Sequence, residues 1–403
     1  MTKEKVILAY SGGLDTSVML KWLKKKGYEI VCYIADVGQS KDFKKLKEKA
    51  LKTGASKVYI CDLKEELIEK YIFEMIKANA IYEGKYLLGT AIARPIIAKK
   101  QVEIARKENT IYLAHGCTGK GNDQVRFELT WMKFMPELQI ISPWKDKEFL
   151  KEFKGRNDLV KYAKQEKIDI DIVKEKIYSK DENIMHISYE SGSLEKLENK
   201  ANIDTYQLIK PIEKTNDYKT EISIEFKKGI PKKIINITEN KEFTDPLKFF
   251  IYLNKIAGEN GIGRIDIVED RFIGIKSRGV YETPAGTVLY KAHKDLESIT
   301  LDKELIQLKE LFSPIIGRLI YNGFWFSPEM QFLMAAVNKS QEKVNGKIYM
   351  DLYKGNIIIT KRKSESSLYK EELSSMQKEG GFNQKDAEGF IKINGLRMKY
   401  SGE

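Results

Sequence analysis

Apolar runs alternate with amphipathic stretches over the first part of the chain. Consecutive apolar residues predict buried strands, at 6–8, 29–37, 57–61, 111–114 and 139–144. Apolar positions at helical spacing predict a helix directly after Ser17 and others at 42–53, 65–79, 92–107 and 155–168. Strands that alternate with helices predict a parallel sheet covered on both faces, whose ligands bind at the carboxyl ends of the strands. Residues 1–168 are therefore predicted to form an α/β domain.

The pattern changes at about residue 169, where short β-prone pieces are joined by Gly, Pro and Asn. These pieces predict a second, α+β domain over residues 169–360. Its predicted elements are strands at 221–226 and 233–237, a helix at 246–259 and a longer helix near 327–345. Beyond it, residues 364–376 have a helical pattern, and residues 380–400 are polar with too few apolar positions for a core. We expect residues 361–403 to be an arm that packs on a neighbouring subunit or frays.

Composition restricts the class of protein. The chain has 403 residues, 42% hydrophobic and 32% charged, as is typical of a soluble globular protein. No apolar stretch approaches the length of a membrane span, and the first residues, MTKEK, lack the apolar core of a signal peptide. We therefore expect a cytoplasmic protein without a membrane partner. Its three cysteines and three histidines are scattered, so we expect neither disulfides nor a metal site built by the protein alone.

The net charge of +12 raises the question of a nucleic-acid partner. Sixty of the 70 basic residues are lysines spread along the whole chain, which is typical of a solvated surface. We therefore expect no nucleic acid, although the positive field would steer anionic small molecules. The arginines are distributed differently from the lysines, because several lie in segments that contain Gly, Asn or Asp. There the planar guanidinium group could bind a carboxylate through two hydrogen bonds. These arginines are Arg94, Arg126, Arg264, Arg271 and Arg278.

Residues 9–17, AYSGGLDTS, link the first predicted strand to the first predicted helix. Gly12 and Gly13 lack a Cβ, so their N–H groups can approach an anion closely. The serine and threonine hydroxyls and the positive end of the helix add to this binding capacity. The spacing is neither that of a Walker loop nor that of a dinucleotide loop. The pattern predicts a phosphate site, and a simple chain reversal is the alternative.

A second polar segment, residues 115–128, reads HGCTGKGNDQVRFE and follows the predicted strand at 111–114. Its glycines allow the backbone to approach a ligand, whereas Asn122 and Asp123 can bind an amine and Arg126 a carboxylate. Because it shares the carboxyl edge of the sheet with the phosphate loop, it predicts a ligand-binding segment there. An ordinary polar loop with a helix cap is the alternative.

These blocks carry a resemblance to a known family. The AYSGGLDTS loop resembles the SGGxD[ST] pyrophosphate loop of the ATP pyrophosphatases. Together with residues 86–95, 115–128, 178–192, 261–287, the NGFWFSP and DLYKGN segments and the QKDAEGFIKINGLR tail, it resembles the successive signature blocks of the argininosuccinate synthase family. The resemblance implies an adenine nucleotide α-hydrolase-like domain with a parallel sheet, an α+β synthetase domain and a C-terminal helical arm. It also implies a homotetramer in which the arm reaches a neighbour.

The activity implied by the resemblance is the condensation of L-citrulline with L-aspartate, in arginine biosynthesis. ATP is consumed through a citrullyl-adenylate, and AMP and diphosphate are released. Mg²⁺ would arrive with ATP, and Asp15 would cap the helix or orient the ion. No catalytic residue follows from the resemblance.

The resemblance also carries three sets of binding residues. Those expected to bind ATP are Ala9, Tyr10, Ser11, Gly12, Gly13, Leu14, Asp15, Thr16, Ser17, Ala35 and Gly116. Those expected to bind citrulline are Tyr86, Asn122, Arg126, Ser179, Ser188, Glu269 and Tyr281. Those expected to bind aspartate are Thr118, Asn122 and Asp123. Because several of them lie beyond residue 178, the site is expected to form between the two domains.

One position departs from the family pattern. Ala91 stands where the family usually has a serine that contacts citrulline, and the missing hydrogen bond would cost about 1 kcal/mol unless Thr90 or a water replaces it.

Two other functions remain open. A tRNA-modifying sulfurtransferase or lysidine-type ligase shares the phosphate loop, but a thiolating enzyme needs a placed cysteine, and Cys117 has no cysteine partner nearby. A nucleotide-binding sensor without turnover would share the fold.

Overall fold

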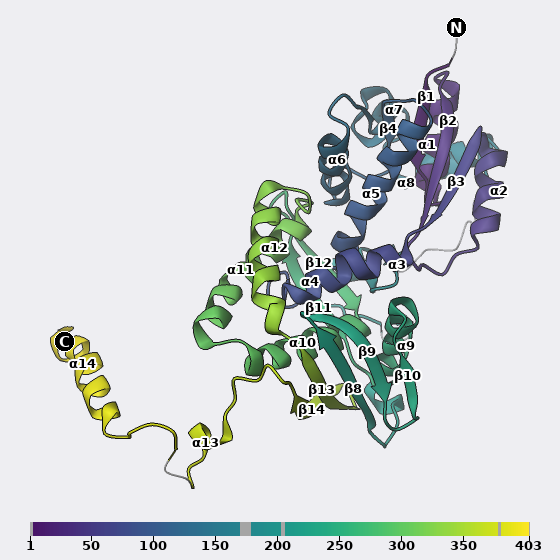
Figure 1. Cartoon of the computed structure of the whole chain (residues 1–403). Helices are drawn as coiled ribbons and strands as arrows, with labels where there is room; N and C mark the ends of the chain where they lie inside the picture. Colours follow the sequence, from purple (N-terminus) through teal and green to yellow (C-terminus); the bar gives the residue numbers. More distant parts are fainter. Residues whose placement is uncertain (1–2, 170–178, 203–205, 378–379, 403) are drawn as a thin grey trace.

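The computed structural model describes residues 3–169, 179–202, 206–377 and 380–402, and Figure 1 shows the whole chain. The N-terminal part contains a five-stranded sheet in the order β3-β2-β1-β4-β5, and each neighbouring pair is parallel. Its strands are β1 (Lys5–Ala9), β2 (Glu29–Asp36), β3 (Lys57–Asp62), β4 (Tyr112–Ala114) and β5 (Gln139–Ile141). From β1 the strand order runs through β2 to β3 at one edge of the sheet, and from β4 it runs to β5 at the other edge. A ligand crevice is therefore expected between the carboxyl ends of β1 and β4.

Helices cover both faces of this sheet, as its continuous apolar strands require. They are α1 (Leu14–Lys25), α2 (Phe43–Thr53), α5 (Gly89–Lys107), α6 (Asp123–Phe134), α7 (Lys147–Glu152) and α8 (Arg156–Gln165). Ile7 of β1 belongs to the core that includes α5, whereas Val6 and Leu8 belong to the core of α1 and α8. The helix predicted at 65–79 is α3 (Lys64–Leu67), a π-helical turn η1 (Ile68–Ile72) and α4 (Phe73–Lys77).

Two antiparallel sheets form the second part (Figure 1). One has the order β11-β12-β7-β6 and consists of β6 (Ser179–Glu182), β7 (Ile187–Glu190), β11 (Arg264–Asp270) and β12 (Lys276–Glu282). The other has the order β10-β9-β8-β13-β14 and consists of β8 (Thr220–Lys227), β9 (Ile230–Asn236), β10 (Lys241–Phe243), β13 (Gly346–Tyr353) and β14 (Asn356–Lys363). The longer helices are α9 (Pro246–Glu259), α10 (Pro284–Thr300), α11 (Lys303–Tyr321) and α12 (Pro328–Ser340). Short 3-10 turns lie at η3 (Gly192–Glu195), η5 (Ile212–Lys214) and η6 (Gln341–Lys343), and another, η2 (Pro143–Lys145), lies in the N-terminal part.

Three sequence expectations for the second part and the arm were incomplete or wrong. Helices α10 and α11 were missed because each contains a residue that disfavours helices, Gly286 in α10 and Pro314 in α11. The helices form nevertheless, because packing against the core outweighs this local preference. The helix expected near 327–345 ends at Ser340 and has 13 residues, one fewer than α9. The segment 364–376 is helical only in α13 (Glu371–Ser374), which buries no residue.

The two parts share one continuous apolar core. Residues of α4 and α5 belong to the same cluster as residues of α9, α10 and α11. The helix α14 (Asp386–Tyr400) buries no side chain and lies apart from this core (Figure 1). No helix in the described part of the chain is long and apolar enough to cross a membrane.

Candidate active site

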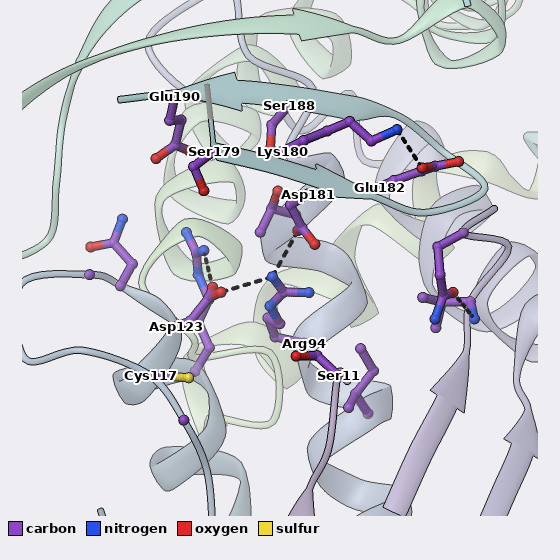
Figure 2. A pocket seen from close by; sticks show the side chains of 18 of the residues that line it. Ser11, Arg94, Cys117, Asp123, Ser179, Lys180, Asp181, Glu182, Ser188 and Glu190 are labelled. Atoms are coloured by element: carbon purple, nitrogen blue, oxygen red, sulfur yellow. Dashed lines mark hydrogen bonds and ion pairs between the residues drawn. The ribbon is translucent and has the colours of Figure 1, made fainter. Parts of the chain in front are cut away.

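A cavity of about 1320 Å³ lies where the carboxyl edge of the parallel sheet faces β6 and β7 (Figure 2). Its volume exceeds the roughly 300–1,000 Å³ that is usual for a site with one ligand. All residues expected to bind citrulline or aspartate line it, namely Tyr86, Thr118, Asn122, Asp123, Arg126, Ser179, Ser188, Glu269 and Tyr281. Of the residues expected to bind ATP, it is lined by Ala9, Tyr10, Ser11, Asp15, Thr16, Ala35 and Gly116. Gly12, Gly13, Leu14 and Ser17 belong to the same loop but do not line the cavity.

The loop after β1 has a backbone that only glycine suits at one position. Gly12 has a φ of +76°, and a Cβ there would lie 2.2 Å from Cδ2 of Leu46. The Ser11 hydroxyl accepts a hydrogen bond from the Gly13 N–H and lies 3.2 Å from the hydroxyl of Thr16. This leaves the hydroxyls and the first turn of α1 grouped at one edge of the cavity.

Asp15 does not cap α1. The cap position is Gly13, which makes no side-chain cap hydrogen bond, and Asp15 lies within the first turn. Burial raises the pKa of the Asp15 carboxyl. The N-terminal N–H groups of α1 therefore have no capping side chain, which suits the binding of an external anion.

Two lysines contact the backbone of the loop, and the motif gave no signal for them. The Lys41 ammonium donates to the Ser11 carbonyl at 2.9 Å, and the Lys49 ammonium donates to the Gly12 carbonyl at 2.8 Å. Both ammonium groups place positive charge beside the loop, and Lys41 also lines the cavity.

Asp123 is held by two guanidinium groups. It is the first residue of α6, its Oδ2 lies 2.8 Å from Arg94 Nη2, and its Oδ1 lies 2.9 Å from Arg126 Nη1. Burial alone would raise the pKa of Asp123, but the two arginines hold it well below its usual range. The carboxylate is thus ionised and fixed by ion pairs. The alternative role for Asp123, helix capping, is excluded because the cap position of α6 is Asn122.

Arg94 also connects the two parts of the molecule. Its Nη2 lies 2.7 Å from Oδ2 of Asp181 on β6, so one guanidinium bridges a carboxylate of each part (Figure 2). The sequence marked Arg94 as an arginine outside the lysine-rich faces, but nothing in the pattern pointed to Asp181. An arginine in a lysine-rich chain was the signal that could have found this bridge.

Stacked tyrosines form the wall opposite the phosphate loop. The rings of Tyr86 and Tyr281 stack with centroids 4.2 Å apart. The Glu269 carboxylate accepts hydrogen bonds from Tyr281 at 3.0 Å and from Tyr321 at 2.6 Å. Burial raises the pKa of Glu269, whereas the phenol hydrogen bonds and Arg126 oppose that shift. Tyr321 was missed because it lies in none of the recognised motifs and its helix, α11, was not predicted.

The four-stranded sheet places its polar residues by register. Ser179 on β6 lies opposite Glu190 on β7, and Ser188 on β7 lies opposite Asp181 on β6 and Tyr281 on β12. This pairing brings side chains from three strands to the same wall of the cavity. Sequence spacing alone could not give this register, because β12 follows β7 only after 85 intervening residues.

The position of the unusual alanine is now defined. Ala91 is completely buried in α5 and does not line the cavity, whereas Thr90 does. The Thr90 hydroxyl lies 2.9 Å from Nε2 of His186. Burial lowers the pKa of His186 to about 4, so its ring is neutral at physiological pH. The site therefore offers a hydroxyl next to position 91, held by a neutral imidazole.

Cys117 lines the cavity, while Cys32 and Cys61 do not, and all three are free. Burial raises the pKa of the Cys117 thiol, which makes it a poor nucleophile. No group of three or more His, Cys, Asp or Glu side chains in the described ranges is arranged to hold a metal ion.

The chain is similar to known proteins along nearly its whole length. A family model described as the arginosuccinate synthase N-terminal HUP domain matches residues 5–169, and one described as the arginosuccinate synthase C-terminal domain matches residues 178–401. The argininosuccinate synthase of Thermotoga sp. (strain RQ2) is 57% identical over 397 residues, 98% of this chain and 97% of the relative. That of Xenopus laevis is 50% identical over 398 residues, 99% of this chain and 97% of the relative.

A solved structure, described as a predicted subunit of tRNA methyltransferase from Methanocaldococcus jannaschii, is 21% identical and covers 40% of this chain and 74% of its own, with a TM-score of 0.27. Nothing is inferred from so low a score. The family models together match nearly the whole chain, and the relatives keep half or more of its residues over the same length. The chain therefore belongs to the argininosuccinate synthase family, whose members are ligases that form a C–N bond.

Proposed function

We propose that this chain condenses L-citrulline with L-aspartate at the expense of ATP, through a citrullyl-adenylate, to give argininosuccinate, AMP and diphosphate in arginine biosynthesis. One observation carries the proposal. A single cavity is lined by the phosphate loop and by every residue expected to bind the two amino acids. A sensor without turnover would not need three ligands in one space.

In the first half of the proposed reaction, the ureido oxygen of citrulline attacks the α-phosphorus of ATP. The loop after β1 would receive the leaving diphosphate, with Ser11, Thr16 and the first N–H groups of α1 as donors. These donors stabilise charge that develops only as the bond breaks, which is how such groups accelerate a reaction. Ala35 and Gly116 line the same cavity and leave room for the nucleoside.

Citrulline would lie between α6 and the tyrosine wall. Arg126 can bind its α-carboxylate, and Glu269 its α-ammonium or ureido N–H groups, which gives an amino acid one charge partner of each sign. Ser179 and Ser188 supply hydroxyls from β6 and β7. The stacked Tyr86 and Tyr281 would exclude water from the aliphatic part of the substrate.

In the second half, the amine of aspartate displaces AMP from the citrullyl carbon. Thr118, Asn122 and Asp123 would hold aspartate, with the ionised Asp123 near its ammonium group. The two arginines fix the Asp123 carboxylate before the substrate arrives, so little of the binding energy is spent on orienting it.

Magnesium would enter as part of the MgATP substrate. Mg²⁺ in such sites is held by the phosphates, by waters and by one or two carboxylates. Asp15 lines the cavity beside the phosphate loop, which supports it as the protein ligand. The ion would neutralise charge on the leaving diphosphate.

We further propose a cytoplasmic homotetramer held together by the arm, residues 361–403, which follows the domains at 1–168 and 169–360. The free thiols suit a reducing compartment. The helix α14 exposes large apolar side chains, among them Phe390 and Ile393, which a partner subunit would cover. Light scattering of the chain truncated after Lys363, the last residue of β14, tests this, because a smaller particle is expected and an unchanged mass would contradict it.

Pyrophosphate release tests the proposed activity. We expect argininosuccinate, AMP and diphosphate to form only when ATP, citrulline and aspartate are all present. Neither amino acid should be replaceable by tRNA, and any tRNA binding should be weak and fall steeply with salt. Tight, salt-resistant tRNA binding would instead favour the tRNA-modifying alternative.

A further inference from the structure

The proposed reaction needs a proton acceptor that none of the expected binding residues supplies. Aspartate enters with an ammonium group, and only the free amine has a lone pair for attack on the citrullyl carbon. The acceptor must line the cavity, lie near the loop at 118–123 and not be held in a close ion pair or hydrogen bond. The carboxylates that line the cavity are Asp15, Asp123, Asp181, Glu182, Glu190 and Glu269.

Five of these six carboxylates are held by contacts of 3.0 Å or less or lie at the nucleotide end of the cavity. Asp123 and Asp181 are paired with Arg94, and Asp123 also with Arg126. Glu269 accepts hydrogen bonds from two phenols. The remaining two lie at the nucleotide end, because Asp15 is in the phosphate loop and Glu182 is bonded to Ser40 and to Lys180.

The histidines are no better suited. His186 does not line the cavity. His115 lines it, but its Nε2 lies 2.9 Å from Glu128 and its Nδ1 accepts from the Cys117 N–H at 3.2 Å.

Glu190 remains, and its surroundings fit the task. It ends β7, and Figure 2 shows its carboxylate directed from that strand into the cavity, on the side where Asp123 lies. Within the described residues its one hydrogen-bond or ion-pair partner is Arg271, whose Nη2 lies 3.3 Å from Oε2. The same guanidinium donates to the carbonyl of Lys120 at 3.3 Å and so ties Glu190 to the loop that is expected to bind aspartate.

The neighbouring backbone and charges support this assignment. Ser191 has a φ of 65° and a ψ of −173°, a conformation that only glycine adopts without strain and that functional sites tend to retain. Burial raises the pKa of Glu190 to about 7, with Glu269 and Asp123 adding to the shift and Arg271 and Arg126 opposing it. A carboxyl with that pKa can accept and return a proton near neutral pH.

We propose that Glu190 is the general base that takes the first proton from the aspartate ammonium, an assignment that rests on the proposed function. One N–H bond breaks and an O–H bond forms on Glu190. The nitrogen lone pair then forms the new C–N bond, and the C–O bond to AMP breaks with its electrons going to the AMP phosphate. The nitrogen loses its second proton to solvent as AMP leaves, which completes the guanidinium of the product.

Separating the two half-reactions tests this assignment. Exchange of labelled diphosphate into ATP, with citrulline but no aspartate, reports adenylation alone. We expect Glu190→Gln to keep that exchange within about threefold of wild type and to lose at least about 100-fold in argininosuccinate formation, as loss of a general base predicts. Glu190→Asp should recover part of the lost rate. Glu195→Gln removes the same charge from an exposed residue outside the cavity and should behave as wild type.

The pH dependence gives an independent readout. As the pH approaches the pKa of the aspartate ammonium, free amine becomes available and the deficit of Glu190→Gln should shrink. Equal loss of exchange and of product formation, with weaker citrulline binding, would overturn the assignment and make Glu190 a citrulline ligand. Unchanged product formation would also overturn it. A wild-type chain without citrulline-dependent exchange would refute the proposed function instead, so the two failures are distinguishable.

Discussion

Arg94 on α5 and Asp181 on β6 form an ion pair of 2.7 Å that joins the nucleotide side of the cavity to the antiparallel sheet. The same nitrogen of Arg94 also lies 2.8 Å from Asp123. One side chain thus orients an expected aspartate ligand and sets the distance between two walls of the site. Arginine suits this role because its fork is planar and always charged.

Replacing this arginine by lysine should affect aspartate more than citrulline. In Arg94→Lys a single ammonium group cannot reach both carboxylates with the same geometry, so Asp123 loses part of its support. We expect the KM for aspartate to rise about tenfold, which corresponds to about 1.4 kcal/mol, and the KM for citrulline to change less. Arg106→Lys, on an exposed turn of the same helix, is the matched control. A larger effect on citrulline than on aspartate would contradict this account.

The phosphate loop should matter for turnover and little for stability. Ser11 is exposed, so Ser11→Ala should change the free energy of unfolding by no more than about 0.5 kcal/mol. Loss of one donor to a leaving group should nevertheless reduce kcat by about 100-fold to 1,000-fold. Asp15→Asn should likewise reduce turnover more than it lowers Tm. Parallel losses of Tm and activity would show a structural role instead.

Thr90 should supply the hydroxyl that position 91 lacks. It lines the cavity and Ala91 does not, so Thr90→Val should raise the citrulline KM by about fivefold, the equivalent of about 1 kcal/mol for one hydrogen bond. Thr90→Ser keeps the hydroxyl and should bind citrulline almost as wild type. Ala91→Ser should have a smaller effect than Thr90→Val. If Ala91→Ser bound citrulline at least fivefold more tightly than wild type, position 91 and not Thr90 would be the place where a hydroxyl contacts citrulline.

Lowering the pH should remove the stabilisation that the hydrogen bonds of the Glu108 carboxylate give to the folded state. Hydrogen bonds from Lys5, Lys57 and Tyr59 lower the pKa of Glu108 from 4.5 to about 2. Because the pKa is lower in the folded state, the unfolded state binds the proton first, and the stabilisation is present above pH 4.5 and lost as the pH falls towards 2. Urea unfolding at pH 7 and at pH 3 measures it.

The matched variant is Glu108→Gln. It should be less stable than wild type at pH 7, by at most about 3 kcal/mol, and the difference should narrow at pH 3. A difference that is the same at both pH values would exclude the ion-pair origin of the stabilisation.

The first sheet could be predicted because its strands are continuous apolar runs. Strands β1 to β4 lie close to their predicted ranges, and both polar loops follow the strands at the predicted edge. Residues 170–178, which directly follow the predicted start of the second domain at residue 169 and include Tyr178 of one signature block, lie outside the described residues. The second part was harder because Gly286 and Pro314 lie inside helices whose packing outweighs local preference.

The site could be predicted only where residues adjoin a motif. Ser11 and Asp123 belong to segments whose composition suggested ligands, and the resemblance supplied positions such as Ser188 and Tyr281. Long-range partners gave no such signal. The bridge between Arg94 and Asp181 spans 87 positions, and the contact of Arg271 with Lys120 spans 151. Such contacts depend on how two separate parts of the chain pack, which no local pattern encodes.

The path of one oxygen atom tests the central claim most directly. Citrulline labelled with ¹⁸O in its ureido group is incubated with the chain, ATP and aspartate, and the nucleotide product is analysed by mass spectrometry. The account predicts AMP that carries the label, because the ureido oxygen attacks the α-phosphorus and stays there when the C–O bond breaks. Formation of ADP, or of AMP without the label, would contradict it.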